Sequence, residues 1–392
     1  MALQEAVVSP MGRRVLATIA VLGFLSVIDT AAISPIIANY AGLLGAGEAL
    51  SGLIVGIYSI VALPSSIIMG VLVDRVGRRR SLLFGLAWDV LAMLGYALAT
   101  NPPLLLAVRM LHAVGDSIIL PASLAIIGDL WAGRLGKPLS TYWVFVGISI
   151  VVASFTAAGL VTLLGFRPLF LFLTLAMLGG LVAVLRIRET YQVRGGVGVI
   201  ARRLARISPT LILSYSPLLS LYLAIGTIVG ALGLSLQRYL EITQQQAAGQ
   251  VGIYVGITTV ASLPVFPLVS RWLERRGVRF LLLSGLIPTA LSQLLLVLSL
   301  GLPLRLLSAV LLGLGLAPIF VGASAVSASM NPEIRGASAG LQQLVILLGV
   351  AVGSPVAGGL LEGWGYPAPF IWSLAAQLAA LPAALYGTRG LR

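Results

Sequence analysis

Twelve long apolar runs, separated by short polar segments, follow one another along the chain. Each run holds about 20 residues, enough for a helix to cross a hydrocarbon core of about 30 Å. A membrane β-barrel would instead show shorter segments in which apolar and polar residues alternate. The pattern therefore predicts an all-α polytopic membrane protein with twelve transmembrane helices. The predicted spans are residues 13–40, 48–72, 81–99, 103–129, 138–164, 167–187, 211–236, 247–271, 280–300, 303–329, 336–361 and 367–387.

The sequence repeats itself at a spacing of 200 residues. One offset holds without a gap across five spans and a charged loop, which chance matches in an apolar chain would not maintain. Two parallel copies predict two pseudo-symmetric six-helix bundles, with the functional site between them. We assign the N-terminal bundle to residues 1–187, a cytoplasmic linker to 188–210 and the C-terminal bundle to 211–392. The matched pairs include Gly52 and Gly252, Pro64 and Pro264, Gly85 and Gly285, Gly115 and Gly315, and Gly165 and Gly365.

The charges are consistent with this class and orient the chain. The sequence has 25 Lys and Arg against 12 Asp and Glu, a formal net charge of +13, and a mean hydropathy of +1.05. The basic residues are spread over many short loops, which argues against a nucleic-acid partner and is typical of the positive-inside rule. With the first span starting inside, 21 of the 25 basic residues lie on the cytoplasmic side. We therefore expect the chain to lie in the plasma (inner) membrane with both termini cytoplasmic. As a separate expectation, we take the protein to be a monomer.

The most highly charged segment, residues 70–80, carries one acid and four arginines in eleven residues. With the twelve spans and the two parallel halves, it resembles the signature of the major facilitator superfamily of secondary transporters. That signature lies between the second and third helices and is matched by Gly70, Asp74, Arg75, Gly77, Arg78 and Arg79. The opening of the eleventh helix in this family is matched by Pro332, Glu333, Arg335 and Gly336, and Arg109 loosely matches a motif of the fourth.

A conformational gate is expected at the charged loop. The eleventh helix is predicted to begin near Arg335, so the positive end of its dipole would face Asp74, and a carboxylate there is stabilising. Arg75 or Arg78 is expected to pair with Asp129 when the inside is closed, and such state-dependent contacts bias a two-state equilibrium. The repeat adds the corresponding residues of the second half. The candidate gate residues are Gly70, Asp74, Arg75, Gly77, Arg78, Asp129, Glu274 and Arg275.

Charged residues deep in the spans are candidates for transport, because charge is costly inside hydrocarbon. The first half offers Asp29 in span one and Arg109, His112 and Asp116 on one face of span four. Asp29 and Asp116 lie at similar depths, about 24 and 20 Å into their spans. Acids near a guanidinium suit proton coupling or substrate binding; a static ion pair is the structural alternative. For Asp89, on a helix that is peripheral in this family, we expect a structural partner.

No residue pattern indicates enzymatic chemistry. The absence of cysteine excludes disulfides and thiolate sites, and no cluster suggests a hydrolytic triad or a metal centre. We therefore expect no enzyme, cofactor or metal, and the partners to be a small-molecule substrate, protons and the lipid bilayer.

The sequence favours a secondary active transporter that moves a small organic solute by alternating access, coupled to protons, with export of amphipathic compounds as the first hypothesis. The alternatives are a facilitator or importer of a metabolite or organic anion held by Arg109, and a transport-dead sensor or scaffold. The fifth span lacks the glycine–proline pattern of the family's drug–proton antiporters, and a similar pattern in residues 349–359 is attributed to helix packing. Candidate cavity residues are Tyr215, Tyr222, Thr227 and Tyr254.

Overall fold

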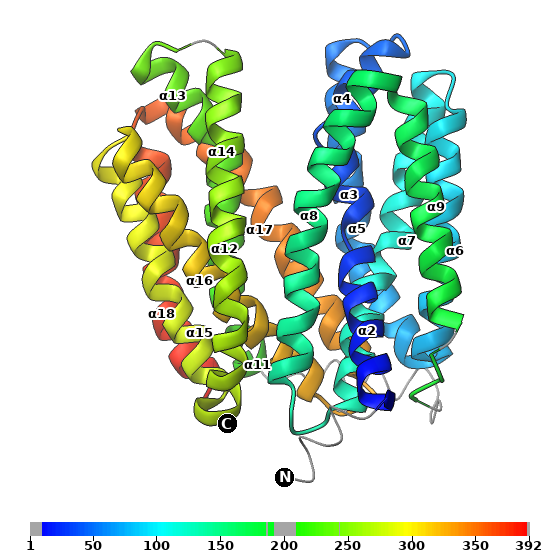
Figure 1. Cartoon of the computed structure of the whole chain (residues 1–392). Coiled ribbons are helices and arrows are strands. Elements are labelled where there is room, and N and C mark those ends of the chain that lie inside the picture. Colours follow the sequence, from blue (N-terminus) through cyan, green and yellow to red (C-terminus); the bar gives the residue numbers. More distant parts are fainter. Residues whose placement is uncertain (1–9, 186, 192–208, 243, 390–392) are drawn as a thin grey trace. The chain divides into compact units, whose positions relative to one another are not determined.

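The computed structural model describes residues 10–185, 187–191, 209–242 and 244–389, and these residues form helices and turns without a strand (Figure 1). In the first half, α6 (Arg78–Leu98) lies beside both α7 (Pro102–Leu130) and α9 (Phe166–Leu185), and α5 (Glu48–Val76) packs along α7. In the second half, α18 (Ala368–Gly387) lies beside both α12 (Ser216–Thr227) and α15 (Phe266–Leu298). The helices of the first half are α2 (Pro10–Leu25), α3 (Ile28–Ile33), α4 (Ile37–Leu43), α5 (Glu48–Val76), α6 (Arg78–Leu98), α7 (Pro102–Leu130), α8 (Gly136–Leu164) and α9 (Phe166–Leu185). Those of the second are α11 (Pro209–Ser214), α12 (Ser216–Thr227), the π-helix η1 (Ile228–Leu232), α13 (Gly233–Leu240), α14 (Gln244–Ser262), the 3₁₀ turn η2 (Leu263–Val265), α15 (Phe266–Leu298), α16 (Leu302–Ser329), α17 (Arg335–Trp364) and α18 (Ala368–Gly387).

The number of membrane spans agrees with the sequence prediction. Ten segments of the described residues are long and apolar enough to cross a bilayer, and a shorter apolar segment covers residues 17–33. One of the ten, at 49 residues, is long enough for two crossings. Counting that segment twice and adding the shorter one gives twelve spans. The prediction of an all-α membrane protein with twelve helices is confirmed.

The first span is not the continuous helix that the sequence predicted. It is divided into α2, α3 and α4, with breaks at Ser26–Val27 and around Pro35. Pro35 lacks an N–H and so cannot donate the i→i−4 hydrogen bond that would continue the helix, which explains the second break. At the first break the Ser26 hydroxyl bonds to the Gly23 carbonyl over 2.9 Å. The break places Asp29 in the first turn of the six-residue helix α3.

The 200-residue repeat is visible in the backbone. Gly77 has φ +106°, and its counterpart Gly277 has φ +76° at the turn inside α15. Gly165 and Gly365, at the ends of α8 and α17, repeat the correspondence with φ +86° and +70°. These conformations are costly for side chains with a Cβ, so glycine is required at the same place in both copies.

Two compact units account for the internal contacts. The first comprises residues 1–133, 141–204 and 327–344, and the second comprises 134–140, 205–326 and 345–392. The end of α16 and the first ten residues of α17 therefore belong with the N-terminal helices. The predicted linker, 188–210, lies largely outside the described residues, and the division of the chain at that point remains a prediction.

Candidate functional site

The backbones of α5 and α17 cross at glycines within the first unit. A Cβ added to Gly70 would lie 2.6 Å from the Gly336 carbonyl oxygen and 3.1 Å from the Cα of Gly340. Gly336 in turn faces the Gly70 carbonyl, at 2.7 Å from an added Cβ. No side chain fits at distances this short. The glycines thus allow α5 to reach the N-terminus of α17.

The carboxylate of Asp74, one helical turn after Gly70, caps α17. Its two oxygens accept hydrogen bonds from the backbone N–H groups of Gly336 and Ala337, each over 2.8 Å. These amides have no partner within their own helix, and the positive end of the helix dipole adds to the attraction. Asp74 is 1% exposed, so both bonds are sheltered from water. Asp74 thus lies at the start of α17, the helix end that the sequence predicts to face it.

Arg78 connects Asp74 to a second acid. Its Nη1 lies 3.2 Å from Asp74, its Nε donates to Asp129 over 3.0 Å, and its Nη2 donates to the Pro332 carbonyl. Asp129 also accepts a hydrogen bond from Arg335. We call Asp74, Arg78, Asp129 and Arg335 the Asp74 network. Its two carboxylates and two guanidiniums have no net charge, and their mutual attraction offsets the desolvation penalty of burying them.

Two residues that sequence reasoning did not select complete this end of the unit. Glu189 accepts a hydrogen bond from the backbone N–H of Arg78 over 2.8 Å and so caps α6, and it occupies the space where a Cβ on Gly77 would lie. The ring of Tyr191 lies 4.0 Å below the Arg78 guanidinium, and burial raises the pKa of its phenol above the usual value. No motif marks either residue, because both follow α9 in an irregular segment.

The other candidate gate residues lie outside the Asp74 network. Arg75 is half-buried and forms no ion pair with any described residue. Glu274 and Arg275, the counterparts of Asp74 and Arg75 in the repeat, are exposed on α15 and likewise form no ion pair within the described chain. The capping arrangement therefore belongs to one copy of the repeat.

The deep charged residues of the first half form a second group, which we call the Asp29 cluster: Asp29, Asp89, Arg109, His112 and Asp116. Asp29 Oδ2 lies 3.1 Å from His112 Nε2, and both side chains are fully buried. The other imidazole nitrogen, Nδ1, lies 3.1 Å from the Tyr96 hydroxyl. Asp29 Oδ1 accepts a hydrogen bond from the Thr30 backbone N–H over 2.6 Å. Asp29 is thus partnered by histidine and not, as expected, by Arg109.

Asp116 is held by hydroxyl groups. Tyr58 donates a hydrogen bond to its Oδ2, and the Thr30 hydroxyl lies 3.4 Å away. Asp116 is 6% exposed and forms no ion pair within the described residues. A buried acid whose partners are neutral has its charge stabilised only by their dipoles.

Arg109 has no carboxylate partner in the described structure. Its guanidinium lies 4.5 Å from the Tyr58 ring, and Nη1 is 3.4 Å from the Tyr96 hydroxyl. Its Nε makes no hydrogen bond with a described residue, although the side chain is 2% exposed. The i, i+3, i+7 spacing predicted that Arg109, His112 and Asp116 share a face of α7, but it did not reveal that tyrosines separate the arginine from the acids.

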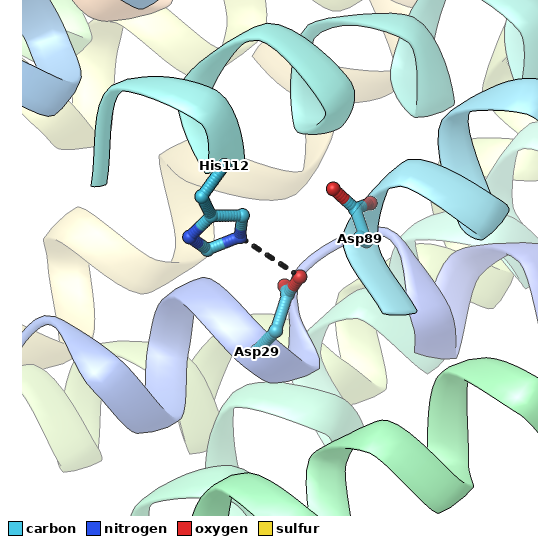
Figure 2. Close-up of side chains that lie close together, drawn as sticks. All are labelled: Asp29, Asp89 and His112. Carbon is cyan, nitrogen blue, oxygen red and sulfur yellow. Dashed lines mark hydrogen bonds and ion pairs between the residues drawn. The ribbon is translucent and has the colours of Figure 1, made fainter. Parts of the chain in front are cut away.

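Asp89 lies beside Asp29 and His112 (Figure 2). One ligand atom from each of the three lies within 4.8 Å of the others, although the residues belong to α6, α3 and α7. Neither Asp89 oxygen has a hydrogen-bond partner in the described structure, and the side chain is fully buried. From the sequence we expect a structural partner for Asp89 and no metal centre. Instead, the structure brings three potential metal ligands together.

The second unit buries neutral polar groups. The hydroxyl of Tyr254 bonds to Ser308 over 2.8 Å, and Gln377 Oε1 accepts from Ser220 and Thr289 over 3.1 and 3.0 Å. Tyr254 is therefore engaged inside the unit. The other cavity candidates are placed as follows: Tyr215 is buried before α12, Tyr222 stacks edge-on against Phe320, and Thr227 bonds to the Leu223 carbonyl.

Comparison with known proteins identifies the family. A curated relative, the chloramphenicol resistance protein of Pseudomonas aeruginosa, is 30% identical over 146 residues, which is 36% of this chain and 34% of that protein. The crystal structure of the human organic anion transporter MFSD10 (TETRAN) superimposes with a TM-score of 0.77, over 96% of this chain and all of that one, at 16% identity. This likeness shows the fold. The Major Facilitator Superfamily matches residues 19–246 and 218–390, so almost the whole chain is covered, and the chain belongs to this superfamily of membrane transporters.

Proposed function

We propose that this transporter moves a small amphipathic organic solute by alternating access, driven by protons, in the direction of export. The supporting observation is Asp116: a buried carboxylate, deep in α7, held by Tyr58 and Thr30 and in no ion pair with a described residue. Such a group can be neutral in one conformation and charged in another when hydration changes, which proton coupling requires. The partial match to a chloramphenicol resistance protein supports an amphipathic substrate.

The Asp74 network would close the inner face in this proposal. Opening the bundle on that side has to separate Asp74 from the amides of Gly336 and Ala337 and Asp129 from Arg335. Those groups are then hydrated. The free energy of the network thus contributes to one state only, which is the condition for setting a conformational equilibrium. The orientation proposed from the loop arginines puts this face in the cytoplasm.

Arg109 favours a second candidate, the transport of an organic anion. Its buried guanidinium has no carboxylate partner among the described residues, and planar guanidinium donors match a carboxylate geometrically. The fold match to an organic anion transporter is consistent with this candidate. In both candidates the chain remains a transporter, and the substrate's charge distinguishes them.

Reconstituted liposomes with an imposed pH gradient test the proposal, with radiolabelled chloramphenicol and benzoate as probes. We expect gradient-dependent accumulation of chloramphenicol. Asp116→Asn keeps the size of the side chain but carries no titratable proton, so it should abolish accumulation while preserving exchange of probe across the membrane. Glu274→Gln, an exposed acid of the second unit, is the control.

Two results would contradict the proposal. If Asp116→Asn accumulates chloramphenicol as the native protein does, Asp116 is not the proton carrier. If instead benzoate alone is transported and Arg109→Gln abolishes its uptake, the organic anion candidate replaces the first.

A further inference from the structure

We propose that Asp29, Asp89 and His112 form a binding site for one divalent transition-metal ion inside the first unit. The three side chains come from α3, α6 and α7 and point into a common space (Figure 2). Two carboxylates and one imidazole suit ions such as Mn²⁺, Co²⁺ and Zn²⁺, which accept both oxygen and nitrogen ligands. The inference does not depend on the proposed substrate or on proton coupling at Asp116.

The unpartnered acid is the first argument. Asp89 is fully buried, and neither of its oxygens has a hydrogen-bond partner in the described residues. A protonated carboxyl would seek an acceptor and an ionised one a donor or cation. The counterpart of Asp89 in the repeat is Thr289, whose hydroxyl bonds to Gln377 over 3.0 Å. The position itself therefore does not require a carboxylate for packing.

The spacing of the ligand atoms is the second argument. At metal–ligand distances of about 2.1 Å, two ligands of one ion lie about 3.0 to 4.2 Å apart. Asp29 Oδ2 and His112 Nε2 already lie 3.1 Å apart, and all three ligand atoms lie within 4.8 Å of one another. A proton cannot bridge groups beyond hydrogen-bond distance, whereas an ion can. Small rotations of the Asp89 carboxylate complete the site.

The surroundings orient the ligands as in known metal sites. A histidine that binds a metal through one nitrogen donates its other N–H to a fixed acceptor. Here His112 Nδ1 lies 3.1 Å from the Tyr96 hydroxyl, which leaves Nε2 for the ion. The Thr30 amide holds Asp29 Oδ1, so Oδ2 faces the site. Gly115 makes room for Asp89, since a Cβ there would lie 2.5 Å from Asp89 Oδ1.

Charge balance selects a divalent ion. The proposed ligands, two ionised carboxylates and a neutral imidazole, together carry two negative charges, whatever the protonation of Asp116. A buried excess of this size is unfavourable in a membrane. One divalent cation cancels it, whereas a monovalent cation leaves one negative charge. The competing solution is two added protons, one on His112 and one on an acid, and this is the alternative that the experiment must separate.

The test measures the metal content of the full-length protein in detergent. The protein is purified without chelator, because a metal ion removed from a buried site would rebind slowly. We expect about one equivalent of metal by mass spectrometry after loading with Mn²⁺ or Zn²⁺, an electron paramagnetic resonance signal of bound Mn²⁺, and a raised melting temperature. Mg²⁺, which prefers all-oxygen sites and keeps its waters, should have little effect. None of these readouts depends on transport, so this inference and the proposed function can fail separately.

Variants identify the ligands. Asp89→Asn should lose the bound metal, Gly115→Ala should weaken binding by crowding Asp89, and Tyr96→Phe should weaken it about 10- to 100-fold by releasing the imidazole. Asp129→Asn makes the same chemical change about 25 Å along α7 from His112; it is the control and should retain the metal. Folded native protein that holds no metal, or an Asp89→Asn variant that binds as much Mn²⁺ as the native chain, would overturn the proposal in favour of protons.

Discussion

Removing the charge of Asp74 should release the start of α17. In Asp74→Asn a single carbonyl oxygen remains, so one of the two amides of Gly336 and Ala337 loses its acceptor and Arg78 loses one of its two acids. A hydrogen bond to a charged group contributes about 1.5 to 3 kcal/mol. A carboxylate at a helix N-terminus contributes about 0.3 to 1 kcal/mol, up to about 2 when partly buried.

We call the state in which Asp74 caps α17 the docked state. Because the two contributions overlap, the variant should lose about 2 to 4 kcal/mol of stabilising free energy in this state. The undocked state is unaffected, since there the carboxylate or amide is hydrated. This corresponds to a shift of about 30- to 700-fold in the equilibrium between docked and undocked α17. A docked state that is favoured tenfold in the native protein becomes the minority in the variant.

The native chain has no cysteine, so the distance can be measured with two introduced labels. Spin labels at Val76→Cys and Asn331→Cys, both exposed positions, span the contact between α5 and the segment before α17. We expect a longer mean distance in Asp74→Asn. Glu274→Gln, at the equivalent position of the repeat, should leave the distribution unchanged because Glu274 is exposed. An unchanged distribution in Asp74→Asn, or an equal change in the control, would refute the reasoning.

Three further predictions follow from the packing and the charges. Gly70→Ala should disfavour the docked state by about 1 to 3 kcal/mol, because its Cβ would lie 2.6 Å from the Gly336 carbonyl oxygen. Gly56→Ala, which has open space around the added Cβ, should be neutral. The same spin labels measure both variants. Gln377→Leu should lower the stability by about 1 to 2 kcal/mol by removing the hydrogen bonds of Gln377 to Ser220 and Thr289. Leu378→Ala, at an exposed position, should have a smaller effect, and equal melting temperatures would contradict this. Ala132→Cys should react with a membrane-impermeant thiol reagent from the cytoplasm only, and Gly47→Cys from outside only; labelling of both from one face would disprove the predicted topology.

The span pattern could be obtained from the sequence because it depends on local quantities. The length of an apolar run decides whether a helix can cross the bilayer. The summed hydropathy of that run does not depend on which other helices pack against it. The 200-residue repeat likewise marked Gly77 and Gly277, which then share a positive φ. The position of Asp74 opposite α17 followed from a helix end having a fixed polarity.

Side-chain partners depended on the tertiary structure. The spacing of Arg109, His112 and Asp116 fixes their common face on α7, but the break before α3 and the approach of α6 decide which groups meet that face. Tyr58 and Tyr96 come between Arg109 and the acids, and Asp89 reaches Asp29 through the space left by Gly115. Helical periodicity constrains one helix at a time, whereas a buried charge is governed by atoms within a few ångströms on other helices. The chain alone determined how many times it crosses the membrane, and packing decided which charges are paired.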